Sequence, residues 1–271
     1  MLTSLKNPWI QTLRKLQQTK YRRQQQQFLL EGTHLVQEAV ATHYPLQAVC
    51  ATLVWQDRHP DLWQQLGLHT ERQETISPEV LGAIATTQTP DGVVAIAIGP
   101  ALTQSIDHPT LGLALEDIQD PGNVGTLIRT AAAVGSDGLW LSQHSVDLTH
   151  PKVLRASAGQ WFRLPKQVGL DLSSQLSTWR HEGCQILATA AAGAVPYWQL
   201  DLTRPTVLVL GNEGAGLSAA AIAAADQTIA IPMMNGVESI NVGVAAAVVL
   251  FEALRQRQQQ DSMSGAPHNP K

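Results

Sequence analysis

The chain has 271 residues, of which 44% are hydrophobic, and 18 Lys and Arg against 22 Asp and Glu give a net charge of −4. This length suffices for one large or two ordinary domains, and no run reaches the roughly 18 apolar residues of a membrane span. The N-terminus lacks the apolar core of a signal peptide. Cys50 and Cys184 lie far apart and the nine histidines are scattered. We therefore expect a cytoplasmic protein with no membrane partner, no disulfide framework and no metal site.

The first hundred residues alternate short helical and strand patterns, which predicts a small α/β domain over residues 1–99. Asn7 and Pro8 form a typical helix start, with an N-cap followed by proline in the first turn. Further helices are expected from Thr33, over residues 61–66 and from Ser77, and strands at residues 28–30, 46–55 and 93–98.

A strongly basic segment precedes the first acidic residue, Glu31. It carries Trp9, Tyr21 and six cations, which are Lys6, Arg14, Lys15, Lys20, Arg22 and Arg23. A local basic face is the electrostatic footprint of phosphate binding, even on a protein whose net charge is negative. A solvated helix face is the commoner explanation of a single charge run, so both interpretations stay open at this point.

A polar linker bounded by prolines is expected at residues 100–109, and strands and helices then alternate more regularly. Strands are expected at residues 111–115, 139–141, 162–164, 185–190, 207–210 and 229–231. Short apolar runs separated by helices indicate a mostly parallel sheet that is buried on both faces. The polar tail at residues 259–271 is expected to be disordered.

Three loops follow the ends of expected strands, at residues 117–123, 211–217 and 233–241. In open α/β sheets, ligands bind outside the carboxyl ends of the strands. The glycines of the second loop let a ligand approach the backbone. That loop carries neither a Walker lysine nor a GxGxxG pattern, so a tight strand-to-helix turn explains it equally well.

The third loop leads into a helix whose residues 242–251 are all small or apolar. A surface helix would show polar residues on every turn, so this helix is expected to be buried on most sides. Ser239 and Asn241 then lie at its N-terminus, where they act as simple caps or contact a polar ligand.

Taken together, the three loops resemble the three motifs of the SpoU/TrmH group of SPOUT RNA methyltransferases. The stretches, in the family's order and spacing, are DPGNVGTLIRTAAAVG from Asp120, LVLGNEGAGLS from Leu208 and IPMMNGVESINVGVAAAVVLFEALRQR from Ile231. This resemblance covers a catalytic domain over residues 110–258. The N-terminal SLKNPWIQTLRKLQQTKYRRQQQQFLLEGTHLVQEA looks like the RNA substrate-binding domain often fused to it, which has a ribosomal-protein-like fold. The resemblance also implies a deep trefoil knot, which topology rules alone would exclude.

The resemblance implies 2′-O-methylation of a ribose in structured RNA by a homodimer that uses S-adenosylmethionine. The N-terminal domain favours 23S ribosomal RNA as the target, with contacts from the six cations. Three alternatives remain: a transfer RNA methyltransferase, a catalytically inactive RNA-binding module of the same fold, and a different nucleotide-binding α/β enzyme.

The motif match implies a role for individual residues. Arg129 is the main expected catalytic residue, and its guanidinium, which stays protonated, is expected to grip the target phosphate and stabilise the developing alkoxide. Asn123 is expected to position the loop and the ribose, and Glu213 to orient Arg129 or the target nucleotide. Ser239 and Asn241 complete the expected catalytic set by shaping the pocket.

The cofactor is expected at the glycine-rich turn and the third loop. By resemblance, main-chain groups at Gly211, Ile231 and Ile240 hold its adenine and ribose, with Leu210 and Met233 beside them. Each assignment has a structural alternative: Asn123, Ser239 and Asn241 are also good helix caps, Glu213 could be a solvated loop residue, and Arg129 an exposed helix residue.

Overall fold

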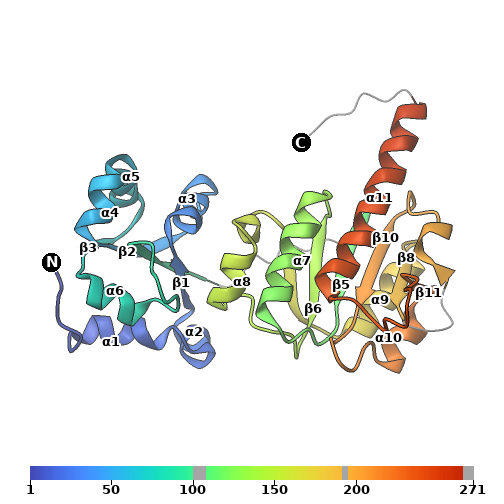
Figure 1. Ribbon diagram of the computed structural model, residues 1–271, viewed down its shortest axis with the longest axis horizontal. Coiled ribbons are helices and arrows are strands. Elements are labelled where there is room, and N and C mark those ends of the chain that lie inside the picture. The colour runs from blue at the N-terminus through green and yellow to red at the C-terminus, as the bar shows by residue number, and fades with distance from the viewer. Residues whose placement is uncertain (100–107, 191–194, 265–271) are drawn as a thin grey trace. The chain divides into compact units, whose positions relative to one another are not determined.

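The computed structural model describes residues 1–99, 108–190 and 195–264, and the chain divides into two compact units. The first unit is Met1–Ala101 with Asp147–Arg163, and the second is Leu102–Val146 with Leu164–Lys271 (Figure 1). A segment from the middle of the chain thus clusters with the N-terminal unit. The predicted domain boundaries stay predictions, and residues 100–107 of the predicted linker lie outside the described residues.

The first unit contains a four-stranded sheet in the order β1-β4-β2-β3. β1 (Gln27–Glu31) and β2 (Leu46–Ala51) pair antiparallel with β4 (Val93–Ile98), and β2 pairs in parallel with β3 (Arg72–Thr75). The accompanying helices are α1 (Pro8–Lys15), α2 (Thr19–Gln25), α3 (Thr33–Ala41), α4 (Leu53–Arg58), α5 (Pro60–His69), α6 (Pro78–Ile84), α8 (Pro151–Ala156) and the 3₁₀ helix η1 (Gln160–Phe162). The expected strand at 46–55 ends at Ala51, because the Thr52 side chain caps α4.

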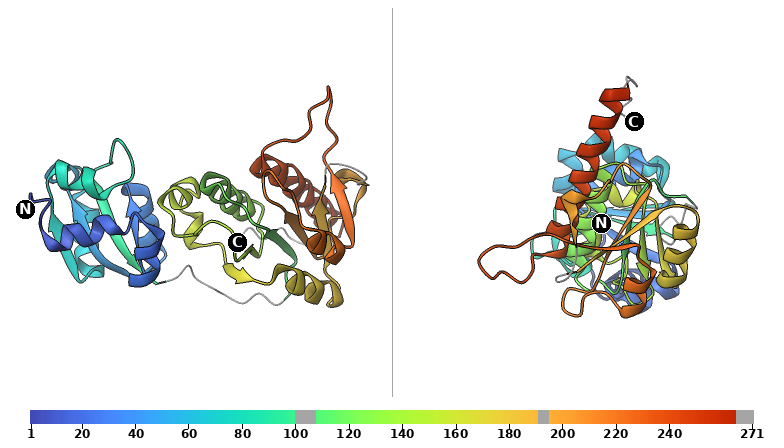
Figure 2. Two further views of the ribbon diagram at one scale, coloured as in Figure 1. Left: turned by 90° about the horizontal axis from the view of Figure 1, so that it is seen from below. Right: turned by 90° about the vertical axis from the view of Figure 1, so that its right-hand side faces the viewer.

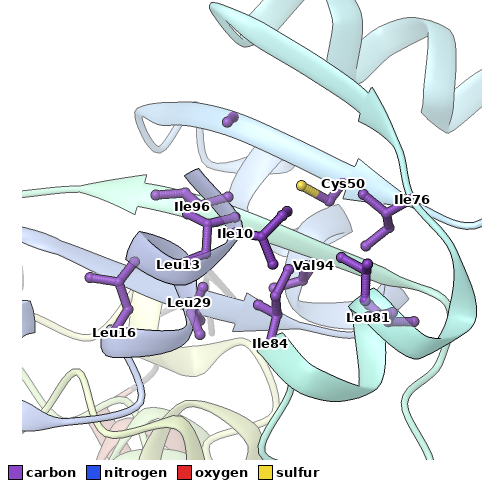
Figure 3. Close-up of a cluster of buried hydrophobic side chains, with 12 residues drawn as sticks. Ile10, Leu13, Leu16, Leu29, Cys50, Ile76, Leu81, Ile84, Val94 and Ile96 are labelled. Atoms are coloured by element: carbon purple, nitrogen blue, oxygen red, sulfur yellow. The ribbon is translucent and has the colours of Figure 1, made fainter. Parts of the chain in front are cut away.

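The core of this unit depends on α1, which begins where the sequence predicts. The Asn7 side chain accepts from the backbone N–H of Trp9 at 2.9 Å, so the first turn is capped. Ile10, Leu13 and Leu16 follow at helical spacing and are fully buried against the sheet and α6 (Figure 3). The segment that carries the basic residues is therefore part of the folded core and not a detachable arm.

The inserted segment Asp147–Arg163 is held to the N-terminal unit by aromatic and charged contacts. The Trp161 ring lies 5.2 Å from Phe28 and 5.5 Å from Tyr44, centroid to centroid. Arg155 pairs with the buried Glu31 at 3.0 Å. Phe162 joins this cluster within η1, so the expected strand at 162–164 is wrong; three apolar residues alone do not distinguish a strand from a helical turn.

The second unit is an α/β layer structure around a seven-stranded sheet in the order β7-β6-β5-β10-β8-β11-β9, with every pair parallel. Its strands are β5 (Leu111–Leu115), β6 (Gly138–Ser142), β7 (Lys166–Leu170), β8 (Gln185–Thr189), β9 (Val195–Pro196), β10 (Thr206–Leu210) and β11 (Gln227–Ala230). Its helices are α7 (Pro121–Ala133), α9 (Leu172–His181), α10 (Ala219–Ala224) and α11 (Val242–Ser264), with the 3₁₀ helix η2 (Tyr197–Gln199).

The helices of this unit pack in pairs, α7 with α11 and α9 with α10 (Figure 1). The predicted mostly parallel α/β fold is confirmed. The trefoil knot is compatible with this arrangement and stays a prediction.

The long C-terminal helix α11 is less enclosed than its apolar sequence predicts. Ala246, Val249 and Leu250 are buried, whereas Val244 is 51% and Phe251 49% exposed. The expectation of burial on most sides is therefore correct for only one face. The helix continues to Ser264, so residues 259–264 are helical where disorder was expected, and residues 265–271 lie outside the described residues.

Candidate active site

A cavity of about 830 Å³ opens where β10 and β11 end. Its walls come from residues 189–190, 210–217, 229–233 and 237–241, closed by Val242, Ala245 and Val249 of α11. The loop between β11 and α11, orange-red in Figure 2, projects from the unit and forms one wall. All five residues expected at the cofactor line this cavity, namely Leu210, Gly211, Ile231, Met233 and Ile240. The described lining contains the carboxylates Glu213 and Glu238 and no lysine or arginine.

The turn after β10 is shaped by a close approach of the chain to itself. A Cβ on Gly211 would lie 2.3 Å from the carbonyl carbon of Gly216, nearer than any real Cβ contact. The Asn212 side chain holds the turn from within, since its Oδ1 accepts from the N–H groups of Gly214 and Ala215, both at 2.9 Å. Glycine at 211 is thus required by the turn itself, whether or not a ligand approaches.

Glu213 projects from this turn to the N-terminus of α7. Its carboxylate accepts from Asn123 Nδ2 at 2.9 Å and from the backbone N–H groups of Asp120 and Gln119 at 3.3 and 3.4 Å. Burial raises the pKa of this carboxyl, but the hydrogen bonds from Asn123 and the backbone outweigh burial and leave the pKa below its usual value. Glu213 therefore stays ionised near neutral pH and acts as an anion at a helix N-terminus.

Asn123 connects Glu213 to the third loop. Its Oδ1 accepts from Asn241 Nδ2 at 2.9 Å, so a hydrogen-bonded row runs from Asn241 through Asn123 to Glu213. Asn241 also caps α11, because its Oδ1 accepts from the N–H of Gly243 at 2.9 Å. Capping and participation in the site are thus combined in one side chain.

The two remaining expected catalytic residues lie apart from this row. Ser239 is exposed and lines the cavity. Arg129 is exposed on α7, does not line the cavity, and makes no ion pair or hydrogen bond within the described residues. The expected orientation of Arg129 by Glu213 is not seen in this single chain, because the Glu213 carboxylate is bound to Asn123 and the start of α7.

Five of the six expected RNA-binding cations are exposed: Lys6, Arg14, Lys15, Lys20 and Arg23. Arg22 is an exception that corrects the prediction. It is 2% exposed, pairs with Asp147 at 2.7 Å, and donates to the carbonyl oxygens of Leu16 and Gln17. Its guanidinium is occupied by these contacts within the folded unit and is not available to bind a phosphate.

Arg72 is an exposed arginine of this unit that the sequence analysis did not single out. The Arg72 guanidinium lies 3.7 Å from the centroid of the Trp9 ring and also binds Glu74. A cation over an indole ring is a favourable contact. No local sequence pattern predicts this contact, because Arg72 is on the polar strand β3 and Trp9 is on α1.

A metal centre and a membrane span are both without support in the parts of the chain that the structure describes. There, no three His, Cys, Asp or Glu side chains come together as metal ligands would. No helix there combines the length and apolar character needed to cross a bilayer.

Comparison with known proteins decides the family. Residues 110–251 match the profile of the SpoU rRNA Methylase family, and residues 7–95 match that of the MRM3-like substrate binding domain. The chain belongs to the SpoU rRNA methylase family. The motif loops that form the cavity and its hydrogen-bonded row all fall within the SpoU match.

The similarity of this SpoU chain to its relatives extends over nearly its whole length. An uncharacterized tRNA/rRNA methyltransferase of Synechocystis is 44% identical over 94% of both chains. The 23S rRNA (guanosine(2553)-2′-O)-methyltransferase RlmP of Bacillus subtilis is 31% identical over 92% of this chain and 97% of its own. The prediction of a SpoU-type RNA methyltransferase is confirmed.

Solved structures agree with the fold of this SpoU chain. An AdoMet-bound rRNA methyltransferase from Sinorhizobium meliloti has a TM-score of 0.83 at 28% identity, covering 94% of this chain and 97% of that one. AviRb from Streptomyces viridochromogenes, in complex with AdoMet, has a TM-score of 0.82 at 28% identity, covering 93% and 99%. S-adenosylmethionine is thus confirmed as a cofactor of the structural neighbours.

Proposed function

We propose that this SpoU chain transfers the methyl group of S-adenosylmethionine to a ribose 2′-hydroxyl of 23S ribosomal RNA. The observation that carries the proposal is that the second and third motif loops line one cavity, and that Asn123 of the first loop bonds to both of them in the row Asn241, Asn123 and Glu213. The 23S target rests on the names of relatives such as RlmP. Transfer RNA is the second candidate, because the name of the Synechocystis relative includes it. Either target would place the protein in the cytoplasm.

The cavity suits S-adenosylmethionine in size and in charge. About 830 Å³ lies within the roughly 300–1,000 Å³ typical of small-molecule sites. Leu210, Ile231 and Ile240 supply apolar walls for an adenine ring, with main-chain groups along the second and third loops. A sulfonium cation would meet Glu213 and Glu238 and no basic side chain among the described lining residues.

The bound cofactor would supply an activated methyl group, which leaves the protein to align the ribose oxygen and to assist loss of its proton. Asn123 and Asn241 present amide groups beside the cavity that can orient a ribose hydroxyl. Arg129 would grip the phosphate and stabilise the developing 2′-oxyanion. Glu213, whose oxygens already accept from Asn123 and the start of α7, would keep Asn123 in place.

We infer that a second copy of the chain completes this site. Val244 and Phe251 leave an apolar face of α11 about half exposed, and α11 packs on α7, which carries the exposed Arg129. A homodimer that covers α11 would bring Arg129 of one protomer to the cavity of its partner. Light scattering at micromolar concentration tests the dimer, and a monomer would contradict it.

Mixed dimers test whether Arg129 acts across the interface. Arg129→Ala leaves the cavity intact, whereas Ala245→Trp fills the cavity, which Ala245 lines, and leaves Arg129 intact. Each variant alone should be inactive, and co-expression should restore part of the activity, because one site of each mixed dimer is complete. No restoration, in mixed dimers shown to form, would place Arg129 in its own subunit's site.

RNA binding is assigned to the five exposed cations of α1, α2 and the preceding segment. The target is found by mass mapping of ribosomal and transfer RNA from a strain of the source organism that lacks the gene. One ribose methyl group of 23S rRNA should disappear and return with the wild-type gene but not with Arg129→Ala. Unchanged methylation of all these RNAs would contradict the proposal, and purified protein that binds RNA but not S-adenosylmethionine would instead indicate an inactive module.

A further inference from the structure

Glu116 contacts both ends of the glycine loop, which we define as residues 211–217. Glu116 follows the last residue of β5, and its backbone N–H donates to the carbonyl oxygen of Leu210 at 2.8 Å, where the loop begins. Its side chain accepts from the backbone N–H and the Oγ of Ser218, both at 2.7 Å, where the loop ends. Glu116, which directly follows the neighbouring strand, thus contacts the entry of the loop through its backbone and the exit through its side chain.

The contact with Ser218 uses both oxygens of the carboxylate. Hydrogen bonds to an ionised acceptor are shorter and about twice as strong as neutral ones. Because Ser218 Oγ gives its proton to Glu116, its lone pair is free to accept from the N–H of Ala221 at 3.1 Å, which caps α10. The exit of the loop is therefore anchored to β5 and to the next helix together.

Glu116 itself does not line the cavity, whereas every residue of the glycine loop does. The middle of the loop has other attachments: Asn212 Nδ2 donates to the carbonyl oxygen of Asp117 at 2.9 Å, and Glu213 binds Asn123. The Glu116 side chain holds only the exit of the loop, which follows Gly216, whose φ is +70°.

We propose that Glu116 is a positioning residue that holds the glycine loop in the shape that binds the cofactor. The inference rests on the proposed function, because it takes S-adenosylmethionine as the occupant of this cavity. A loop with glycines at 211, 214 and 216 loses much conformational freedom when it is ordered. If the contact between Glu116 and Ser218 orders the loop before the cofactor arrives, binding no longer has to lose that conformational entropy, and the affinity for the cofactor is higher.

The test compares Glu116→Ala, Glu116→Gln and Ser218→Ala with wild type in the full-length protein. S-adenosylmethionine affinity is measured by calorimetry, and amide hydrogen exchange of the glycine loop is followed in cofactor-free protein. Glu116→Ala should weaken affinity about tenfold and speed exchange in the loop. Ser218→Ala, which keeps the backbone N–H bond to Glu116, and Glu116→Gln, which keeps an acceptor, should each lie between Glu116→Ala and wild type. The double variant Glu116→Ala/Ser218→Ala should bind the cofactor no more weakly than Glu116→Ala, because that substitution alone already removes both hydrogen bonds.

Steady-state methylation separates positioning from catalysis. The KM for S-adenosylmethionine should rise about tenfold in Glu116→Ala, while kcat at saturating cofactor falls less than threefold. Glu182→Gln is the matched control, because Glu182 is an exposed carboxylate of the same unit, and its side chain lies 3.2 Å from Nδ1 of the exposed His108, away from the cavity lining. It should leave affinity and loop exchange unchanged.

The outcomes distinguish this inference from the proposed function. If wild type binds the cofactor and Glu116→Ala binds it within twofold of wild type, the positioning role is wrong, even if the melting temperature falls. If wild type fails to bind the cofactor, the proposed function is wrong and this inference is overturned with it. Weaker binding in Glu116→Ala with loop exchange as slow as in wild type would also overturn the role.

Discussion

The side-chain amide of Asn241 donates to Oδ1 of Asn123 at 2.9 Å, across 118 positions of sequence. The same Asn123 donates through Nδ2 to Glu213 at 2.9 Å. An amide is well suited to this place, because it accepts on one side and donates on the other. The direction of each bond is fixed by the ionised Glu213, which can only accept.

The first prediction follows from that direction. Asn123→Asp would place a second carboxylate against Glu213 and should lower the free energy of unfolding at pH 7. Like charges raise the pKa of one carboxyl above its unfolded value, so the deficit should shrink as the pH falls through that raised pKa and a proton restores the bond. Urea unfolding from pH 7 to pH 4 measures the effect. The double variant Asn123→Asp/Glu213→Gln should recover stability, because the new glutamine amide can donate where the Glu213 carboxylate accepted; a deficit independent of pH would contradict this account.

The second prediction concerns Arg129→Ala. Losing a donor that acts mainly in the transition state costs on the order of a hundredfold to a thousandfold in turnover. Cofactor affinity and stability should change little, because Arg129 is exposed and does not line the cavity. Single-turnover methylation beside cofactor calorimetry checks both, with the exposed Arg58→Ala as control. Near-normal turnover would remove Arg129 from the mechanism.

The third prediction separates two adjacent arginines. Arg22→Gln should destabilise the N-terminal unit by about 3–5 kcal/mol, because it leaves the Asp147 carboxylate, whose side chain is only 14% exposed, without its cation. The exposed Arg23→Gln should leave stability unchanged and lower the salt slope of RNA binding by about 1 if it contacts a phosphate. Thermal unfolding and RNA titrations at several salt concentrations measure the pair. Equal stability of the two variants would show that the Arg22 contacts contribute nothing.

The fourth prediction compares two glycines of the same loop. Gly211→Ala should open the loop and weaken cofactor binding at least tenfold, because its Cβ would meet the Gly216 backbone at 2.3 Å. At Gly214 the nearest atom to a new Cβ is Asn212 Oδ1 at 3.6 Å, an ordinary contact, so Gly214→Ala should fold and bind nearly normally. Calorimetry with S-adenosylmethionine and thermal unfolding distinguish them, and a tolerated Gly211→Ala would refute the steric argument.

The fifth prediction is a pH dependence from Lys166, which is 2% exposed on β7. Burial lowers its pKa from the usual 10.5 to about 7. Between these two values the unfolded chain holds a proton that the folded chain releases, so this group makes stability rise with pH by up to about 1.4 kcal/mol per pH unit. Lys166→Met should flatten that rise between pH 7 and pH 9 in urea unfolding, and parallel curves would contradict the shifted pKa.

Much of the fold follows from local signals. The start of α1 at Asn7 and Pro8, the parallel sheet and the three loops at strand ends are properties of short stretches, and the structure contains each of them. The loops are recognisable because glycine, asparagine and apolar residues occur in them at fixed spacing. The family resemblance adds that the three loops belong to one site, in which the second and third line the cavity and Asn123 of the first bonds to both.

The remaining features depend on partners far along the chain. Arg22 and Arg23 are alike in sequence, and the partner that distinguishes the buried Arg22 most clearly is Asp147, 125 positions away. The strand β3 (Arg72–Thr75) has no apolar alternation to reveal it and lies at the edge of its sheet. The exposed face of α11 has the same apolar composition as its buried face, so the sequence alone does not show which face is exposed to solvent.

The two walls of the cavity come from segments that are synthesised at different times, so the cavity is complete only late in translation. Ribosomes add about 5–20 residues per second, and domains generally fold as their residues emerge. A nascent chain that has reached Leu217 already holds the glycine loop, but it lacks residues 229–233 and 237–242, which form the opposite wall. It also lacks Asn241, which bonds to Asn123. Copies released by premature termination before that point would contain most of the sheet and yet could not sequester the methyl donor, so they would not compete with finished enzyme for it.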